Sequence, residues 1–225
     1  MQRGRGHAKV LRVTDAVTPP RRSIVRRWGP RALFESLLIV FSISLALAIN
    51  AWITDLQTAA RVREARAYFI EELQGNRAML LSDSILPHHR RLHAALEAAP
   101  MEQPLTPEEA RPTLTVVFAT GIHTSALRDV AWSTFSNRDL LGHMQPEQVF
   151  ALNDAYEAQA RIEQLHAVFY PVLVQLPSEF TSAEDARGPL MSLRIHLADV
   201  IVAEEYAVER FDQALAALGA EPSAE

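Results

Sequence analysis

The sequence predicts an all-α protein in which one N-terminal transmembrane helix continues into an extracytoplasmic antiparallel bundle of about four helices. Three observations lead to this prediction. An uncharged and strongly apolar stretch covers residues 36–54. Later segments repeat their apolar residues at steps of three and four, which is the period of an amphipathic helix. Runs of alternating apolar and polar residues, which are typical of strands, are missing from the sequence.

The formal charge is divided between two regions of opposite sign. Nine basic residues against two acidic ones give residues 1–35 a net charge of +7, whereas 13 Arg against 25 Asp and Glu give residues 55–225 a net charge of −12. Residues 1–32 mix Gly, Pro and Arg without a period, which predicts a flexible cytoplasmic tail. A basic tail of this kind contacts anionic membrane lipids. We expect no nucleic-acid partner.

Residues 33–54 are predicted to cross a membrane. The nineteen residues without charge between Ser36 and Thr54 would form about 28 Å of helix, close to the ~30 Å thickness of the hydrocarbon layer. Basic residues gather on the cytoplasmic side of a span. We therefore expect the N-terminus in the bacterial cytoplasm and the rest of the chain in the periplasm. The residues expected at the membrane interfaces are Trp28, Glu35, Asn50 and Trp52.

The residues leave two alternatives to a permanent span. The first is a buried core helix of a soluble protein, and the second is a cleaved signal peptide, because Ala46-Leu47-Ala48 fits a small-residue cleavage site. The helical pattern runs on past Ala48 without a proline or a loop, which favours an uncleaved anchor. The polar groups of Glu35 and Asn50 could contact lipid headgroups or form hydrogen bonds with a partner helix.

The bundle is predicted over residues 55–220, followed by a disordered tail at 221–225. Its first helix continues from the membrane, with apolar residues on one side and Asn76 on the same seam, where a polar residue can fix helix register. That seam contains Leu56, Val62, Phe69, Leu73 and Leu80. A short helix follows Pro87. Four prolines between residues 100 and 112 predict a loop, with a helix start at Thr106.

Three further elements complete the predicted bundle. Residues 124–148 predict one helix that ends near Asn137, with Trp132 and Phe135 either as core anchors or as the centre of a partner-binding surface. A second helix begins at Pro146 and should kink at Pro171. The last helix follows Gly188-Pro189 and stops at Gly219, since glycine commonly ends a helix.

Five short motifs occur together between residues 33 and 160. They are Glu35 at the start of the span, Ile49-Asn50-x-Trp52 at its end, "EELQGN" at 71–76, "AWSTFSNRDLLGHM" at 131–144, and a following helix with Asn153 and Tyr156. This set resembles a family of uncharacterised bacterial single-span membrane proteins, a domain of unknown function. The resemblance implies the same topology and carries no assigned activity.

Candidate catalytic and metal-binding residues are few. Glu163 and His166 have the Glu-x-x-His spacing of di-iron bundles, but the chain has no second such motif. His89 and His93 could share one ion, yet the two arginines between them repel a cation. The lack of cysteine excludes disulfides and thiolate sites. We therefore expect no cofactor and no metal, with Glu163 and His166 as the weak candidates.

The expected function is non-enzymatic. Nucleophile motifs and phosphate-binding glycine loops are missing from the sequence. We expect a single-pass inner-membrane protein whose periplasmic bundle binds a protein partner or a second copy of itself. One alternative is a ligand-sensing bundle that signals through a partner, because the cytoplasmic tail has no room for an output domain. The other is a ferritin-like metal-binding enzyme.

Overall fold

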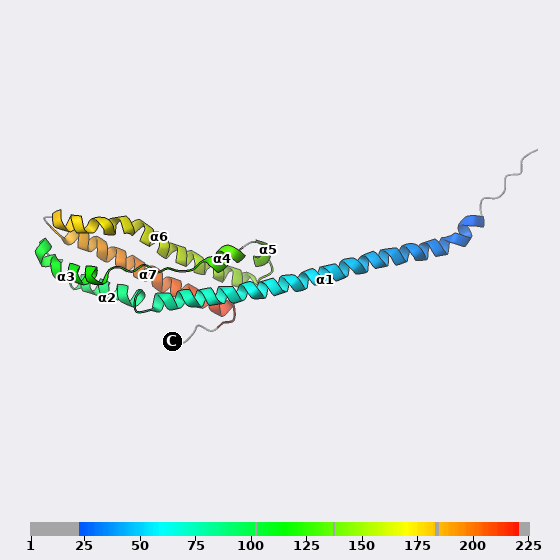
Figure 1. Ribbon diagram of the computed structural model, residues 1–225, viewed down its shortest axis with the longest axis horizontal. Helices are drawn as coiled ribbons and strands as arrows, with labels where there is room; N and C mark the ends of the chain where they lie inside the picture. Colours follow the sequence, from blue (N-terminus) through cyan, green and yellow to red (C-terminus); the bar gives the residue numbers. More distant parts are fainter. Residues whose placement is uncertain (1–22, 102, 137, 183–184, 221–225) are drawn as a thin grey trace, which may run out of the picture. The chain divides into compact units, whose positions relative to one another are not determined.

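The structure is a computed structural model that describes residues 23–101, 103–136, 138–182 and 185–220 (Figure 1). Within these ranges every regular element is a helix, which confirms the all-α prediction. The helices are α1 (Ser23–Leu81), α2 (Leu86–Glu97), α3 (Pro107–Thr120), α4 (Val130–Phe135), α5 (Arg138–Leu141), α6 (Pro146–Ser182) and α7 (Arg187–Ala217). Most of the predicted basic tail and all of the tail at 221–225 lie outside the described residues.

The chain forms two compact units, Met1–Thr54 and Asp55–Glu225, and α1 carries residues of both. The first unit contains a helix that is long and apolar enough to cross a membrane. All its described side chains, from residue 31 to residue 54, are exposed, so this apolar stretch is not buried in a core of the chain. Helix α1 begins at Ser23, inside the segment predicted as a tail, and the side chain of Trp28 lies outside the description.

The polar side chains of the first unit form hydrogen bonds within their own helix. Arg31 Nε lies 3.2 Å from Glu35 Oε1, one turn away, and both side chains are exposed. The hydroxyl of Ser42 donates to the Leu38 carbonyl at 2.8 Å, and the hydroxyl of Thr54 donates to the Asn50 carbonyl at 2.9 Å. Such bonds to the preceding turn satisfy the hydroxyl groups within the helix itself. Trp52 is exposed.

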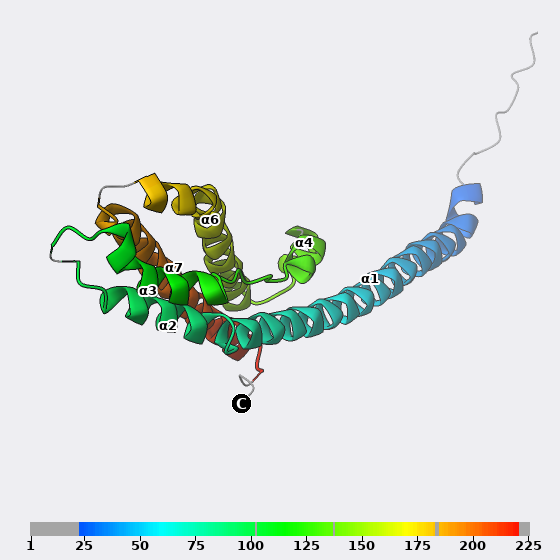
Figure 2. The same cartoon turned by 60° about the vertical axis from the view of Figure 1, so that its left-hand side comes forward.

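The second unit packs α2, α6 and α7 together with the part of α1 that follows Thr54. Helix α7 lies against both α6 and α2, and α3 covers α2 (Figures 1 and 2). Helices α6 and α7 run in opposite directions. Helix α6 continues through Pro171, so the proline does not end it.

The core of the second unit contains two hydrophobic clusters. The first joins α1, α4, α5, the first half of α6 and the second half of α7, and the second joins α2, α3, the middle of α6 and the first half of α7. Fully buried Phe69 and Phe211 belong to the first cluster, and fully buried Leu193 belongs to the second. The predicted seam of α1 enters the core only from Val62 onward, because Leu56 is 54% exposed.

Two predicted helix ends are confirmed by their capping geometry. Thr106 caps α3: its side chain accepts from the Glu109 N–H at 3.3 Å, and the Glu109 carboxylate accepts from the Thr106 N–H at 2.9 Å. These bonds form a capping box and lower the pKa of Glu109 below its ordinary value. Gly219 follows α7 with a φ of 70°, the left-handed conformation that favours glycine at a helix end.

The prediction of one helix that ends near Asn137 is wrong for the first part of that segment. Residues 121–129 have no regular secondary structure, and helical structure begins only with α4 at Val130. We call residues 121–129 the strap. Its backbone groups are bonded by side chains of Asn76, His88 and His89, which replace the hydrogen bonds that a helix would form. The local sequence favours a helix, but these distant side chains stabilise the irregular conformation.

Candidate functional site

The motifs at 71–76 and 131–144 meet the following helix around α4. Glu72 on α1 is buried, and its carboxylate accepts hydrogen bonds from the Ala131 N–H at 3.0 Å and from the Tyr156 hydroxyl at 2.7 Å. One side chain thus connects α1, the start of α4 and α6. Hydrogen bonds to a charged carboxylate are among the stronger ones in proteins. Glu72 therefore fixes the position of α4.

Asn76 fixes the end of the strap one turn further along α1. Its Oδ1 accepts from the Arg128 N–H at 2.8 Å, and its Nδ2 donates to the Arg128 carbonyl at 2.7 Å. Nδ2 also donates to Gln159 Oε1 at 3.0 Å, while Gln159 Nε2 donates to the same Arg128 carbonyl at 3.1 Å. The side chain of Asn76 is thus used to hold backbone, which is a different role from the register function predicted for it.

Aromatic rings surround this hydrogen-bonded centre. Trp132 stacks on Tyr156 with ring centroids 4.9 Å apart, and Phe135 stacks on Tyr68 at 5.5 Å. Fully buried Phe69 lies between them, 6.2–6.3 Å from the rings of Trp132, Phe135 and Tyr156. Trp132 and Phe135 are half-buried. They pack against the first core cluster at its edge and keep one side accessible, so they are anchors of the core rim and surface residues at once.

A groove of about 630 Å³ opens on the side of α4 that faces α1, and we call it the α1–α4 groove. It is lined by Glu64, Tyr68, Glu71, Glu72, Arg128, Val130, Ala131, Thr134 and Phe135. Its volume lies in the range of roughly 300–1,000 Å³ that is usual for binding sites. Three carboxylates and one guanidinium line it, and the two carboxylates of Glu64 and Glu71 are exposed to solvent. The groove therefore combines an apolar wall with an acidic rim.

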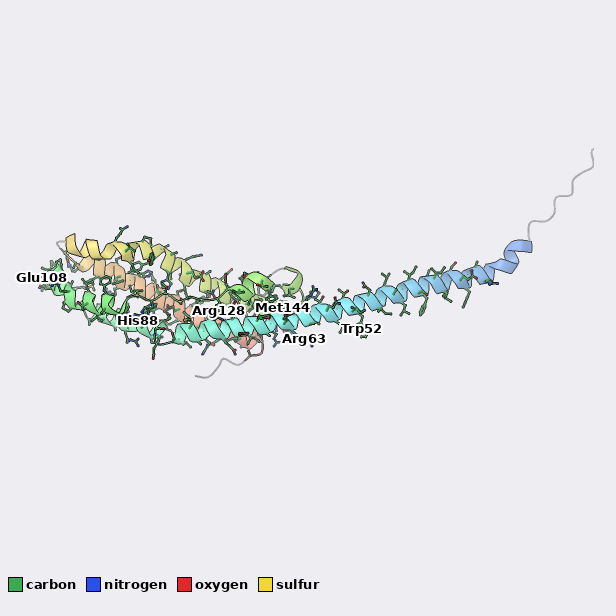
Figure 3. All side chains as sticks on the ribbon, viewed as in Figure 1. Trp52, Arg63, His88, Glu108, Arg128 and Met144 are labelled. Atoms are coloured by element: carbon green, nitrogen blue, oxygen red, sulfur yellow. The ribbon has the colours of Figure 1, made fainter. Side chains whose placement is uncertain are left out.

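A smaller hollow of about 230 Å³ lies on the other side of α4. Its lining residues are Asp129, Trp132, Asn153, Tyr156, Glu157, Gln159, Ala160 and Glu163. It is also acidic, and Trp132 and Tyr156 form its aromatic wall. Figure 3 labels Arg128, which lies just before α4, at the place where the strap enters this region. Helix α4 thus separates two acidic hollows.

The weak metal candidates are not brought together with further ligands. Glu163 is exposed and lines the smaller hollow, whereas the ring of His166 lies 6.3 Å from the ring of His89. Both ring nitrogens of His89 are engaged in hydrogen bonds, and His93 lies 3.7 Å from a carboxylate oxygen of Glu97. Among the side chains that the structure describes, no group of three His, Asp or Glu could hold a metal ion.

The two buried polar side chains beside the site, Tyr156 and Glu72, are bonded to each other. Burial raises the pKa of Tyr156 far above its ordinary value, and the nearby Glu72 carboxylate raises it further. The phenol therefore stays protonated and donates its hydrogen to Glu72. Both oxygens of Glu72 already accept hydrogen bonds from within the chain. A side chain held in this way positions its neighbours, the start of α4 and the ring of Tyr156.

Trp132→Ala should lower the free energy of unfolding by about 2–3 kcal/mol, below the ~3–5 kcal/mol found for fully buried large aromatics, because the side chain is partly exposed. Denaturant unfolding of the detergent-solubilised chain would measure this. Trp132→Phe keeps a ring against Tyr156 and should recover most of the loss. A full loss of ~5 kcal/mol would place Trp132 in the core centre, and no loss would remove it from the core altogether.

Comparison with known proteins does not assign the chain to a family. The resemblance to bacterial single-span proteins, which rests on the motifs that meet around α4, therefore stays a prediction. No protein-family model, no curated protein and no solved structure matches the chain.

Proposed function

We propose that the protein is a single-pass bacterial inner-membrane protein whose periplasmic helical bundle docks a protein partner in the α1–α4 groove. The proposed bundle has about four antiparallel helices. The apolar part of α1 serves as its membrane anchor. The single observation that carries the docking proposal is the groove itself. It presents accessible aromatic rings beside exposed carboxylates, while the buried carboxylate of Glu72 is already bonded within the chain.

The apolar wall supports a protein partner. Val130 is 65% exposed at the edge of the groove, next to the stacked pair of Tyr68 and Phe135. Aromatic residues are enriched at the centres of protein interfaces, where they contribute most of the binding energy. A partner that covers this apolar residue and the two rings would remove apolar surface from water, which favours binding.

The charge of the rim supports a partner segment with Lys or Arg next to apolar residues. Glu64 and Glu71 are exposed carboxylates on one side of the groove, and Arg128 is the one guanidinium among its lining residues. Complementary charge steers association and selects partners. A lysine or arginine side chain in the groove could pair with a carboxylate and lie over a ring.

A second candidate function is the sensing of a small ligand. The observation that favours it is the volume of the groove, about 630 Å³, which suits a small molecule as well as a peptide segment. The two functions differ in a thermal-unfolding experiment on the purified chain. A small ligand should raise the melting temperature in proportion to the logarithm of its concentration. Binding of a protein partner should instead depend on an intact acidic rim.

The anchor is tested by topology and by mass. An alkaline phosphatase fused after residue 225 should be active, and a fluorophore that matures only in the cytoplasm should stay dark at the same position. The intact mass of the purified protein should include residues 1–48. The opposite reporter pattern, or a mature species beginning at Ile49, would overturn the anchoring part of the proposal.

The docking site is tested by reversing its charge. Glu64→Lys and Glu71→Lys should each weaken the recovery of a crosslinked partner from native membranes by about tenfold, since like charges across an interface cost free energy. Asp199→Lys is the matched control, because Asp199 is exposed on α7 and does not line the groove. Equal recovery with all three variants would reject the groove as the docking site.

A further inference from the structure

A second groove of the bundle, of about 390 Å³, starts on α1 only a few residues after Thr54. We call it the α1–α5 groove. Helix α1 contributes Thr58, Arg61 and Glu64 to its lining. The rest of the lining comes from the end of α4, from α5 and from the turn that follows α5. The volume lies within the range of roughly 300–1,000 Å³ that is usual for ligand sites.

The polar side chains that line this groove are available to a ligand. They are Thr58, Arg61, Glu64, Thr134 and His143. Four of them are exposed, and Thr58 is half-buried. Within the part of the chain that the structure describes, none of these five side chains forms a hydrogen bond or an ion pair. The polar groups of Glu72 and Asn76, further along α1, are in contrast used to hold the bundle together.

The apolar part of the lining is fixed by the core. Phe135 is half-buried and stacks on Tyr68, with ring centroids 5.5 Å apart. Leu140 is buried and belongs to the first hydrophobic cluster. Core packing therefore holds α4 and α5 in place against α1, and the groove is formed before a ligand binds.

The ionised groups of Arg61 and Glu64 suit a ligand that carries both charges. They lie three residues apart, on the same side of α1, and they do not form an ion pair with each other. A guanidinium, two hydroxyl groups and a ring N–H of His143 are donors that suit a phosphate. The Glu64 carboxylate suits an ammonium group, and it would repel a ligand that is only anionic.

The position of the groove along α1 indicates where such a ligand would come from. Helix α1 is continuous from Ser23 to Leu81. At a rise of ~1.5 Å per residue, Thr58 lies about 6 Å and Arg61 about 10 Å beyond Thr54 along the helix. The headgroup layer on each side of the hydrocarbon is about 5–8 Å thick. If the span ends at Thr54, as the proposed function requires, the groove starts among the phosphates of the outer headgroup layer.

We infer that the α1–α5 groove binds the headgroup of a zwitterionic phospholipid with a primary amine, namely phosphatidylethanolamine. The phosphate accepts hydrogen bonds from Arg61, Thr58 and His143, and the ammonium group donates to Glu64. The acyl chains stay in the bilayer. A choline headgroup has no N–H to donate to Glu64, and a glycerol headgroup leaves the carboxylate beside a lipid of net negative charge.

This inference rests on the proposed membrane anchor, but not on the docking of a protein partner. The two grooves share the lining residues Glu64, Thr134 and Phe135. Arg61 and His143 line only the α1–α5 groove, whereas Glu71 lines only the α1–α4 groove. Changes at Arg61 therefore test the lipid site, and changes at Glu71 test the docking site.

Native mass spectrometry of the purified full chain in detergent measures the lipid preference directly. The probes are dioleoyl phosphatidylethanolamine, phosphatidylcholine and phosphatidylglycerol, added together in equal amounts. The chain with one bound phosphatidylethanolamine should exceed each of the other two adducts by about tenfold, because a hydrogen bond to a charged group is one of the stronger ones. Glycerophosphoethanolamine, the same headgroup without acyl chains, should not displace the lipid at equal concentration.

Arg61→Gln and Glu64→Gln should each lower the phosphatidylethanolamine adduct by about tenfold. Arg63→Gln is the matched control. Arg63, labelled in Figure 3, is exposed on α1 and does not line the groove, and residues two apart do not face the same side of a helix. The control removes the same charge at nearly the same depth and should leave the adduct unchanged. All three positions are exposed, so circular dichroism should show the same melting temperature as for the parent chain.

Three results would overturn the inference. They are equal adducts of the three lipids, an equal loss from Arg61→Gln and Arg63→Gln, and displacement of the lipid by an equal concentration of glycerophosphoethanolamine. The second would show general attraction of positive charge to the membrane, and the third would reject a lipid as the occupant.

The outcomes also separate this inference from the proposed function. A chain that is anchored as proposed, but binds the three lipids equally, overturns the lipid site alone. Selective binding of phosphatidylethanolamine, together with partner recovery that Glu71→Lys does not change, supports the lipid site and rejects the docking groove.

Discussion

Phe69→Ala should lower the free energy of unfolding of the bundle by about 3–5 kcal/mol, the range for emptying the site of a fully buried aromatic. Phe69 is completely buried on α1 and lies within 6.3 Å of the ring centroids of Trp132, Phe135 and Tyr156. Its removal leaves a cavity at the point where α1, α4 and α6 meet. Because domains are stable by only about 5–15 kcal/mol, the loss would be a large part of the total.

Denaturant unfolding followed by circular dichroism would measure the effect on the detergent-solubilised chain. Val202→Ala is the control, because Val202 is 64% exposed on α7 and should change the free energy by less than about 0.5 kcal/mol. Phe69→Leu refills part of the space and should recover part of the loss. A change below about 1 kcal/mol for Phe69→Ala would show that the three rings are not held together by a common core.

Glu204→Leu should have an effect of similar size, about 3–5 kcal/mol at pH 7, although it removes no aromatic ring. Breaking a buried ion pair from one side leaves the other charge without compensation, and this costs more than the pair itself contributes. His89 lies 3.0 Å from Glu204, and both side chains are fully buried. The variant must therefore either leave the buried Nδ1 atom of His89 without its partner or move the ring and give up a hydrogen bond of the strap.

The adjacent carboxylate provides the control for this prediction. Glu205 pairs with Arg90 at 2.6 Å on the surface, and Glu205→Leu should cost only about 0–1 kcal/mol. Replacing both buried partners, His89→Leu with Glu204→Leu, should be less destabilising than Glu204→Leu alone. Equal effects of the changes at 204 and 205, measured by the same unfolding experiment, would contradict the buried pairing of His89 with Glu204.

The helices were predictable from the sequence, because their period and their ends depend on residues that are close together in the chain. The capping box at Thr106, the start of α6 at Pro146 and the stop at Gly219 each depend on residues within a few positions of the helix end. The buried side of α7 follows the same period, with Leu190, Leu193 and Leu197 fully buried. Local chemistry determines these features.

The strap was not predictable, because its structure depends on residues far away in the sequence. Asn76 bonds Arg128 across 52 positions, and His89 bonds the His123 carbonyl across 34. The segment 124–129 has no proline or glycine, so its local propensity favours a helix. Distant side chains that form hydrogen bonds with the non-helical backbone outweigh that preference. The sequence of the segment itself does not indicate these partners.

The candidate site could be predicted in part. Its motifs, "EELQGN" and "AWSTFSNRDLLGHM", mark the segments that meet at α4, but the pairing of Glu72 with the Ala131 N–H could not be read from their spacing. Glu204 was missed altogether. It lies 115 positions from His89, and a glutamate on an amphipathic helix is ordinarily exposed.

Site-specific photocrosslinking tests the central claim, the docking of a partner in the α1–α4 groove, most directly. A photoreactive residue would replace Val130 at the groove or Val202 on α7, two valines that are 65% and 64% exposed. In native membranes at pH 7.5, the substitution at 130 should give one discrete adduct that is lost when Glu64→Lys is added, and the substitution at 202 should give none. Adducts from both positions, or an adduct at 130 that persists with the reversed charge, would contradict the account.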